Sequence, residues 1–561
     1  MAATLTAIFR RDGEPDHLAD PKTLQEWLTN QPQNDDLALQ EAMVRLLEEM
    51  GARHAKVTVA RTRAVLDLDR HSIPVQGRLV KQYLHPALSE LVRQRLWHAN
   101  EDLARWFAYS FEILFAAISE FRFSARGKSL LPAVASRMFH YRGEQAKQGL
   151  FRYERWIPGR WKGLHDAYAE TVERRIARHR YSPEPGGEEY SAEEEYLQVM
   201  LLQRVNSGNF SPAQIDVIAA WLRGCAHLLK LSPAPLEGDG FWLDLGLGDG
   251  LLARKPANPQ GAVLYLDIGP LHAEMERGQV ELAALAERAP SPAQQQDAAV
   301  RLGLLQRIDP LLRPRAKPVE RRGQRMPTDQ AVAVAVGLSE IAAALHSTVI
   351  DDVAPEKTRA GTRKRGGAKV EPAASVGAMT SPASGVVEYA GAIAQGPSGW
   401  RMHDSSESGC CLVSNVQEGR QRLGGVLGIQ EEGDERWKIG LVRRLKKLAG
   451  GRIEAGVEFI ALQSFLIEPM AIASRDSGYT VDGIEVGADA RGFDALYLPP
   501  SGERGTEPLR SMLVPAAEHS AGRRLALTIG STAYTVELTT PIERGKDWVW
   551  TRFAVVTRTE G

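Results

Sequence analysis

The sequence predicts a multidomain α plus β protein with an all-helical N-terminal region, a C-terminal antiparallel β-barrel and an additional β module. Apolar residues repeat at helical spacing from about residue 20 to residue 230. After residue 385 they alternate along short segments that are separated by Gly and charged turns. With 561 residues, 43% of them apolar, the chain is long enough for three or four domains.

Charge and cysteine content limit the class of protein. The positive charges of Lys plus Arg (69) and the negative charges of Asp plus Glu (70) nearly cancel. The protein therefore has no overall electrostatic field that would attract nucleic acid or an anionic membrane. Three cysteines, Cys225, Cys410 and Cys411, are too few for a disulfide framework, and the N-terminus lacks the order of a signal peptide. The most apolar run, Trp106 to Ile118, is too short for a membrane span. We therefore expect a soluble, cytoplasmic protein.

The first 230 residues contain several helix signals. A stripe of apolar residues from Leu103 to Phe121 predicts a buried helix with Asn100 as its N-cap. Ser191 begins a capping box, and Ser211 with the following proline begins another helix. The stripe of that last helix includes Cys225, which favours a core thiol over a reactive one.

The sequence pattern changes in the middle of the chain. Two short alternating runs, 241–245 and 263–268, predict a small paired sheet. Helical patterns follow at 271–286 and 293–305, and the Ala/Val-rich stretch from Asp329 to His346 predicts a further helix.

A basic, low-complexity stretch then separates the two halves of the chain. Its composition predicts a linker, and it carries Arg359 and Arg363 as an R-x-x-x-R pair. Two guanidinium groups at this spacing can clamp phosphates or stack on purines. The alternative is a flexible basic tether. Arg321 and Arg325 form a second R-x-x-x-R, farther upstream.

The β-rich region begins with a loop of the form D-x-S-x-x-G, made by Asp404, Ser406 and Gly409. An isolated match of this kind is typical of an ordinary surface turn. Its neighbours are more specific, and they follow it in this order: Gly424-Gly425, the segment W-K-I-G-L-V-R-R at 437–444, and the segment A-G-V-E-F at 455–459.

Together these segments resemble the PilZ domain, a bacterial β-barrel whose type members bind the second messenger cyclic di-GMP. The resemblance covers roughly residues 385–470. It implies that Asp404 and Ser406 hydrogen-bond a guanine and that Gly409 permits close approach. It also implies a pair of arginines, normally just before the first barrel strand. Here we assign that role to Arg359 and Arg363, which lie farther upstream, and Arg401 beside the loop could supply one cation instead.

These observations define five expected segments, of which the last is a second β module built from further alternating runs. The segments are a helical interaction domain (1–231), a mixed segment (232–350), a flexible basic linker (351–384), the PilZ-like barrel (385–470) and the second β module (471–561).

The function that we expect is that of a non-enzymatic receptor or effector. The sequence shows no catalytic motif, no metal-ligand spacing and no cofactor motif. Cyclic di-GMP is the expected ligand, and the helical region is expected to pass the signal to an unidentified protein partner. The alternative is a degenerate PilZ protein that binds no nucleotide and acts as a scaffold. A third hypothesis, nucleic-acid binding by the basic segments 313–325 and 357–369, is disfavoured by the balanced charge.

Overall fold

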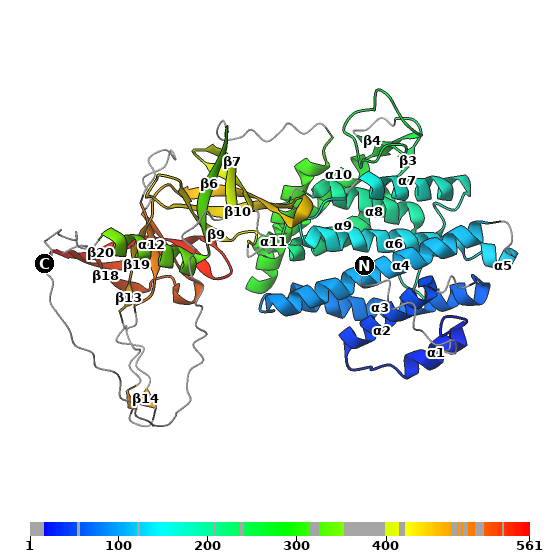
Figure 1. Cartoon of the computed structure of the whole chain (residues 1–561), viewed down its shortest axis with the longest axis horizontal. Coiled ribbons are helices and arrows are strands. Elements are labelled where there is room, and N and C mark those ends of the chain that lie inside the picture. The colour runs from blue at the N-terminus through cyan, green and yellow to red at the C-terminus, as the bar shows by residue number, and fades with distance from the viewer. Residues whose placement is uncertain are drawn as a thin grey trace, which may run out of the picture. The chain divides into compact units, whose positions relative to one another are not determined.

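The chain divides into two compact units in the structure, which is a computed structural model (Figure 1). The first unit comprises residues 1–321 with 444–448, and the second comprises 322–443 with 449–561. The structure describes residues 16–52, 56–120, 124–156, 158–206, 208–235, 240–314, 325–352, 399–414, 421–472, 480–481, 484–485, 492–499, 510–529 and 532–560.

The first unit is mainly helical, which confirms the predicted N-terminal fold (Figure 1). Its helices are α1 (Pro21–Thr29), α2 (Asp36–Ala52), α3 (Val59–Leu84), α4 (Glu90–Ser119), α5 (Ala125–Lys128), α6 (Leu131–Phe151), α7 (Pro158–Glu173), α8 (Ala192–Val205), α9 (Pro212–Cys225), α10 (Gly269–Arg288) and α11 (Pro292–Ile308), with 3-10 turns η2 (Ala226–Leu228) and η3 (Asp309–Leu312). Short strands accompany them: β1 (Arg180–Tyr181), β2 (Tyr190–Ser191), β3 (Leu231–Ser232), β4 (Gly240–Asp244) and β5 (Val263–Asp267).

Two of the three predicted helix caps are confirmed. Ser191 and Ser211 each form a complete capping box, and Cys225 is buried in α9, where burial raises the pKa of its thiol to about 12. The predicted cap at Asn100 is wrong, because α4 begins at Glu90. The Asn100 side chain is buried within α4 and accepts a hydrogen bond from Gln40 at 3.0 Å.

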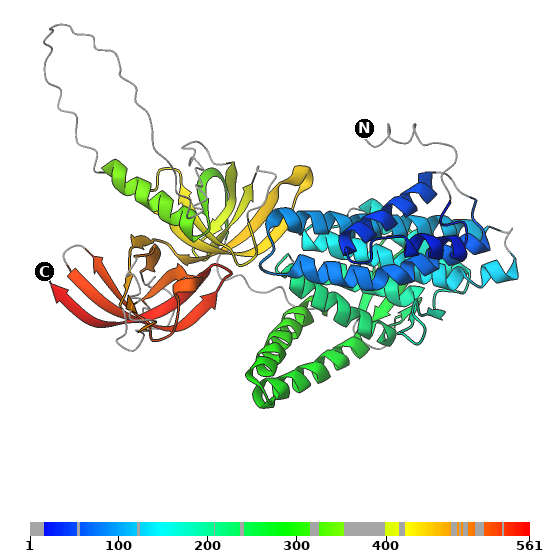
Figure 2. The ribbon, with the colours of Figure 1, turned by 90° about the horizontal axis from the view of Figure 1, so that it is seen from below.

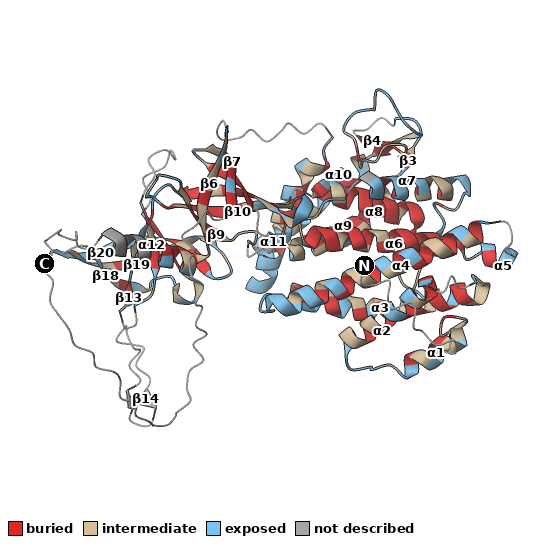
Figure 3. Cartoon of the chain, in the orientation of Figure 1, coloured by how far each residue is buried: buried red, intermediate tan, exposed pale blue. Residues whose placement is uncertain are grey.

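The core of the helical unit also contains a buried ion pair. Arg137 donates two hydrogen bonds to Asp69, at 2.6 and 2.8 Å, and the Tyr141 hydroxyl donates a third at 2.6 Å. All three side chains are buried. Buried residues are prominent along α6, α8 and α9 of this unit (Figure 3). A buried charge persists only when it is paired and hydrogen-bonded, and this triad links α3 to α6.

The second unit contains a closed six-stranded barrel. Its strands are β6 (Met326–Val336), β7 (Trp400–Ser406), β8 (Gly409–Ser414), β9 (Val426–Glu431), β10 (Lys438–Lys447) and β11 (Ile453–Ala461), with η4 (Ala449–Gly451) before β11. They close in the order β10-β11-β8-β7-β6-β9, and neighbouring strands pair antiparallel where a register is defined.

The first barrel strand corrects the sequence interpretation. The helix expected over 329–346 is a strand as far as Val336, and α12 (Leu338–Asp352) follows it after Gly337. Alternating Ala and Val fit both periods, and pairing with β7 and β9 decides for the strand. Gly337 has φ +87°, a conformation that suits glycine at this junction. The barrel therefore includes a strand from before the expected boundary at residue 385.

The additional β module is a curved seven-stranded sheet, shown in orange and red in Figure 2. Its strands are β12 (Phe465–Ile467), β13 (Met470–Ala471), β16 (Ala495–Leu498), β17 (Ser511–Pro515), β18 (Arg524–Ile529), β19 (Thr532–Arg544) and β20 (Trp548–Glu560), with η5 (Ala516–Glu518). A separate pair is formed by β14 (Thr480–Val481) and β15 (Ile484–Glu485). Strands β12 and β13 come from one stretch of chain yet lie at opposite edges, as expected of a strongly curved sheet.

The barrel, α12 and the module share one apolar core. Ile341 of α12 and Ile439 of β10 belong to the same buried cluster as Leu496 and Trp548 of the module. Arg443 of β10 bonds both Glu458 of β11, at 2.8 Å, and Glu543 of β19, at 2.6 Å. None of the described helices in either unit has the length and apolar character that a membrane span requires.

Candidate ligand-binding site

The D-x-S-x-x-G segment forms the tight hairpin between β7 and β8. Ser406 and Gly409 face each other in the register, so Glu407 and Ser408 make the turn. The Ser406 hydroxyl donates a hydrogen bond to the Gly409 carbonyl at 3.0 Å. A Cβ atom on Gly409 would lie 2.2 Å from the carbonyl oxygen of Val457 in β11. Glycine is therefore required here by the close approach of a neighbouring strand.

Asp404 forms an ion pair with Arg325. The Nη1 group of Arg325 donates to Oδ1 of Asp404 at 2.6 Å, and each side chain keeps about a third of its surface exposed (32% and 30%). Arg325 immediately precedes β6, and Pro327 in that strand is the register partner of Asp404. The pairing of β6 with β7 thus brings the arginine beside the loop.

Irregular strand pairing lies next to this ion pair. The register between β7 and β8 shifts between Met402 and Asp404, and the register between β6 and β7 shifts between Pro327 and Gln330. Bulges redirect side chains and are frequent beside functional sites. Here both shifts lie between Met402 and Asp404 on β7.

Arg401 has a different partner. Its guanidinium donates to the Asp329 carboxylate at 2.8 Å and to the Asp329 carbonyl at 2.7 Å. The side-chain hydrogen bond lowers the pKa of Asp329 and raises that of Arg401. This pair links β7 to β6 on the exposed surface.

Cys410 lies directly after the hairpin and is fully buried. Burial, reinforced by the adjacent Cys411 and Asp404, raises the pKa of its thiol to about 12. The thiol therefore stays protonated and packs as a core side chain, and it supplies no nucleophile to the loop.

Four of the predicted residues lie on this hairpin: Asp404, Ser406 and Gly409, together with Arg401, which is paired with Asp329. Arg359 and Arg363 lie outside the described residues. The pair that contains Arg325 ranked second in the sequence-based prediction. The signal that favours this pair is the run of alternating Ala and Val that follows it at 331–336. Once that run is a strand, the pair Arg321 and Arg325 stands just before the first barrel strand, although Arg321 itself lies outside the described part of the chain.

A closed antiparallel barrel with this hairpin motif defines a PilZ-domain protein. The comparison with family models agrees and goes further. A model described as "Cyclic-di-GMP receptor FimW, N-terminal domain" matches residues 22–235, and one described as "Cyclic-di-GMP receptor FimW, middle PilZ domain" matches residues 397–465. The two matches together cover about half of the 561 residues. The chain belongs to the cyclic-di-GMP receptor FimW family.

The matched ranges correspond to structural parts of the chain. The first spans α1 to α9 and continues to the beginning of the small sheet, and the second begins just before β7 and ends at the start of β12. Strand β6 lies outside the second range, although it completes the barrel. The comparisons found no significant match among curated proteins or among solved structures.

Proposed function

We propose that this protein is a receptor that binds cyclic di-GMP on its PilZ barrel. In this proposal Arg321 and Arg325 hold the phosphates, and Asp404 and Ser406 bind a guanine edge. The observation that carries the proposal is the 2.6 Å ion pair between Arg325 and Asp404, which joins one residue of each motif. The match to the receptor family supports the same ligand.

The ion pair also suggests how binding proceeds. A guanidinium has five donors, and only one contact of Arg325 is taken by Asp404, so a phosphate can bind the remaining face. A phosphate that attracts Arg325 away from Asp404 would free the carboxylate to accept hydrogen bonds from guanine. The partial exposure of both side chains leaves them open to a ligand.

The arginine motif has a position suited to relaying the signal. The long first stretch of unit 1 ends at Arg321 and unit 2 begins at Arg322, so the motif lies where the chain first passes from one unit to the other. A ligand that binds both arginines restricts this segment. It then favours those arrangements of the segment that bind the ligand more tightly, and their population increases. We propose that the helical domain then presents a changed surface to a protein partner.

One observation favours a second function. The hairpin residues have structural roles without a ligand, because Gly409 is required by β11 and Ser406 bonds within the turn. A PilZ domain that binds no nucleotide would keep both residues for folding. In that case the protein would act as an interaction scaffold.

Calorimetric titration of cyclic di-GMP into the full chain separates these functions. We expect Arg321→Ala, Arg325→Ala and Asp404→Ala each to weaken binding at least tenfold, because a hydrogen bond to a charged group contributes about 1.5–3 kcal/mol. The double variant Arg359→Ala/Arg363→Ala tests the alternative arginine pair and should bind as the native chain does. Arg524→Ala removes an exposed cross-strand ion pair in the β module and is the matched control.

The possible outcomes distinguish the proposals. If the native chain releases no heat and shows no binding by a second method, such as equilibrium dialysis, the receptor function is wrong and the scaffold is favoured. If only the Arg359→Ala/Arg363→Ala variant loses affinity, the receptor function stands and the assignment of Arg321 and Arg325 is wrong.

A further inference from the structure

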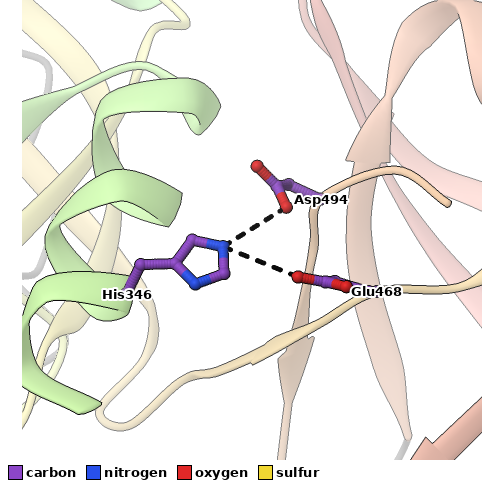
Figure 4. A group of neighbouring side chains, drawn as sticks. All are labelled: His346, Glu468 and Asp494. Carbon is purple, nitrogen blue, oxygen red and sulfur yellow. Dashed lines mark ion pairs between the residues drawn. The ribbon is translucent and has the colours of Figure 1, made fainter. Parts of the chain in front are cut away.

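Three metal-ligating side chains meet at a place that the proposed nucleotide site does not use. His346 lies on α12, Glu468 lies between β12 and β13, and Asp494 lies just before β16 (Figure 4). The segments that carry them are far apart in the sequence, and all three belong to the second unit. One imidazole and two carboxylates therefore converge from separate elements.

The distances fit an ion better than they fit direct hydrogen bonds. The Nε2 atom of His346 lies 3.8 Å from Oε1 of Glu468 and 3.6 Å from Oδ1 of Asp494. Both are too long for a hydrogen bond. Two ligands of a tetrahedral Zn²⁺, with bonds of about 2.1 Å, lie roughly 3.4 Å apart. Ligand atoms of all three residues lie within 4.8 Å of one another, so small side-chain rotations suffice to enclose an ion.

Packing beneath the cluster holds its backbone in place. Ile341 and Ala344 are buried on α12 within the same apolar cluster as Leu496 on β16, and Leu466 of β12 packs against that cluster. Each ligand thus lies within five residues of a core side chain. A site whose ligands stand on packed elements loses less conformational entropy on binding an ion than one made of free loops.

The surroundings leave room for further ligands. His346, Glu468 and Asp494 keep 46%, 65% and 48% of their side chains exposed. Glu468 also lines an open cavity of about 320 Å³ that extends along β18 and β19 past Tyr534. Water or a small anion can therefore complete the coordination from this side.

We propose that His346, Glu468 and Asp494 bind one divalent transition-metal ion of the Zn²⁺ class. Imidazole together with carboxylates suits Zn²⁺, whereas Mg²⁺ prefers oxygen ligands in octahedral geometry. The bound ion connects the end of α12 to the β module. Because α12 follows β6 directly, the ion would also stiffen the connection to the strand that carries Arg325 at its start.

The test uses the full chain, stripped of metal with a chelator and then exchanged into chelator-free buffer. Zn²⁺ is titrated against a chromophoric competitor without cyclic di-GMP, so the result does not depend on the nucleotide site. We expect one equivalent to bind, with affinity reduced at least tenfold in His346→Ala and in Asp494→Asn. His227→Ala, which removes an exposed histidine in the helical unit, is the matched control and should bind as the native chain does.

Spectroscopy supplies a second readout. Co²⁺ in a tetrahedral site with nitrogen and oxygen ligands absorbs visible light far more strongly than Co²⁺ in water, and His346→Ala should abolish this band. Equal far-ultraviolet circular dichroism of the metal-free proteins shows that the variant is folded. The proposal is wrong if the native chain binds no Zn²⁺, if His346→Ala binds it unchanged, or if Mg²⁺ competes at equal concentration.

Discussion

Glu195 is a buried charge of the helical unit that lies beside an opposite charge. Glu195 of α8 is fully buried, and it accepts a hydrogen bond from Arg223 and lies 3.4 Å from His140. Burial alone raises the pKa of Glu195, but Arg223 and His140 outweigh that effect and lower it to about 2. These buried contacts therefore stabilise the folded helical unit only while the Glu195 carboxyl is ionised.

This pKa predicts a pH dependence of stability. The carboxyl has an ordinary pKa of 4.5 when unfolded and about 2 when folded, so the unfolded chain takes up the proton first as the pH falls. The stabilisation is complete above pH 4.5 and is lost between pH 4.5 and 2, a change on the order of 3 kcal/mol. In Glu195→Gln we expect the helical unit to be less stable at pH 7, and the deficit should shrink as the pH falls.

The measurement is urea unfolding followed by helical circular dichroism at several pH values. Glu184→Gln, at an exposed position, is the control and should keep the native pH dependence. A Glu195→Gln variant whose deficit stays constant from pH 7 to pH 2.5 would contradict the assigned pKa.

The local sequence patterns predicted many of the helices and strands. Period and capping residues predicted the helices from α8 to α11 and the barrel strands after residue 410. The prediction was wrong at β6, where a helix was expected. Ala and Val occupy every position of its apolar run, so the sequence shows no alternation of apolar and polar residues that would distinguish a strand from a helix. The deciding contacts, with β7 and β9, lie far away in the sequence.

The hairpin between β7 and β8 gives a prediction at this scale. Gly409→Ala places a methyl group 2.2 Å from the Val457 carbonyl, so either the hairpin or β11 must move. We expect a loss of about 1–3 kcal/mol in the stability of the β unit, as for overpacked positions. Gly492→Ala is the matched control in the same unit, because its nearest contacts of 3.8 and 4.0 Å are ordinary.

Calorimetric scanning of the full chain measures this prediction. The temperature of the unfolding transition of the β unit should fall in Gly409→Ala. In Gly492→Ala it should stay within about a degree of the native value, because a neutral substitution changes the free energy of unfolding by less than about 0.5 kcal/mol. A Gly409→Ala protein with native stability would show that the hairpin glycine is not required for packing. A role in ligand approach would then be its remaining explanation.

At the scale of the whole molecule, the sequence predicted the kinds of domain but not how the chain completes the barrel. The first strand, β6, is separated from β7 by α12 and by residues 353–398, and pairing across such a separation leaves no trace in local periodicity. This same feature changes the candidate site. With β6 in the barrel, Arg325 becomes the residue before the first strand and contacts Asp404. The barrel and the second β module also share an apolar core and belong to the same compact unit.

We propose that cyclic di-GMP binds between the arginines at 321–325 and the hairpin at 404–409. Hydrogen–deuterium exchange of the full chain, with and without cyclic di-GMP, can locate this site. We predict that the ligand slows exchange in peptides covering 321–326 and 404–409 and leaves peptides covering 357–369 unchanged. Slower exchange at 357–369 without any change at 321–326, or no change anywhere at saturating ligand, would contradict it.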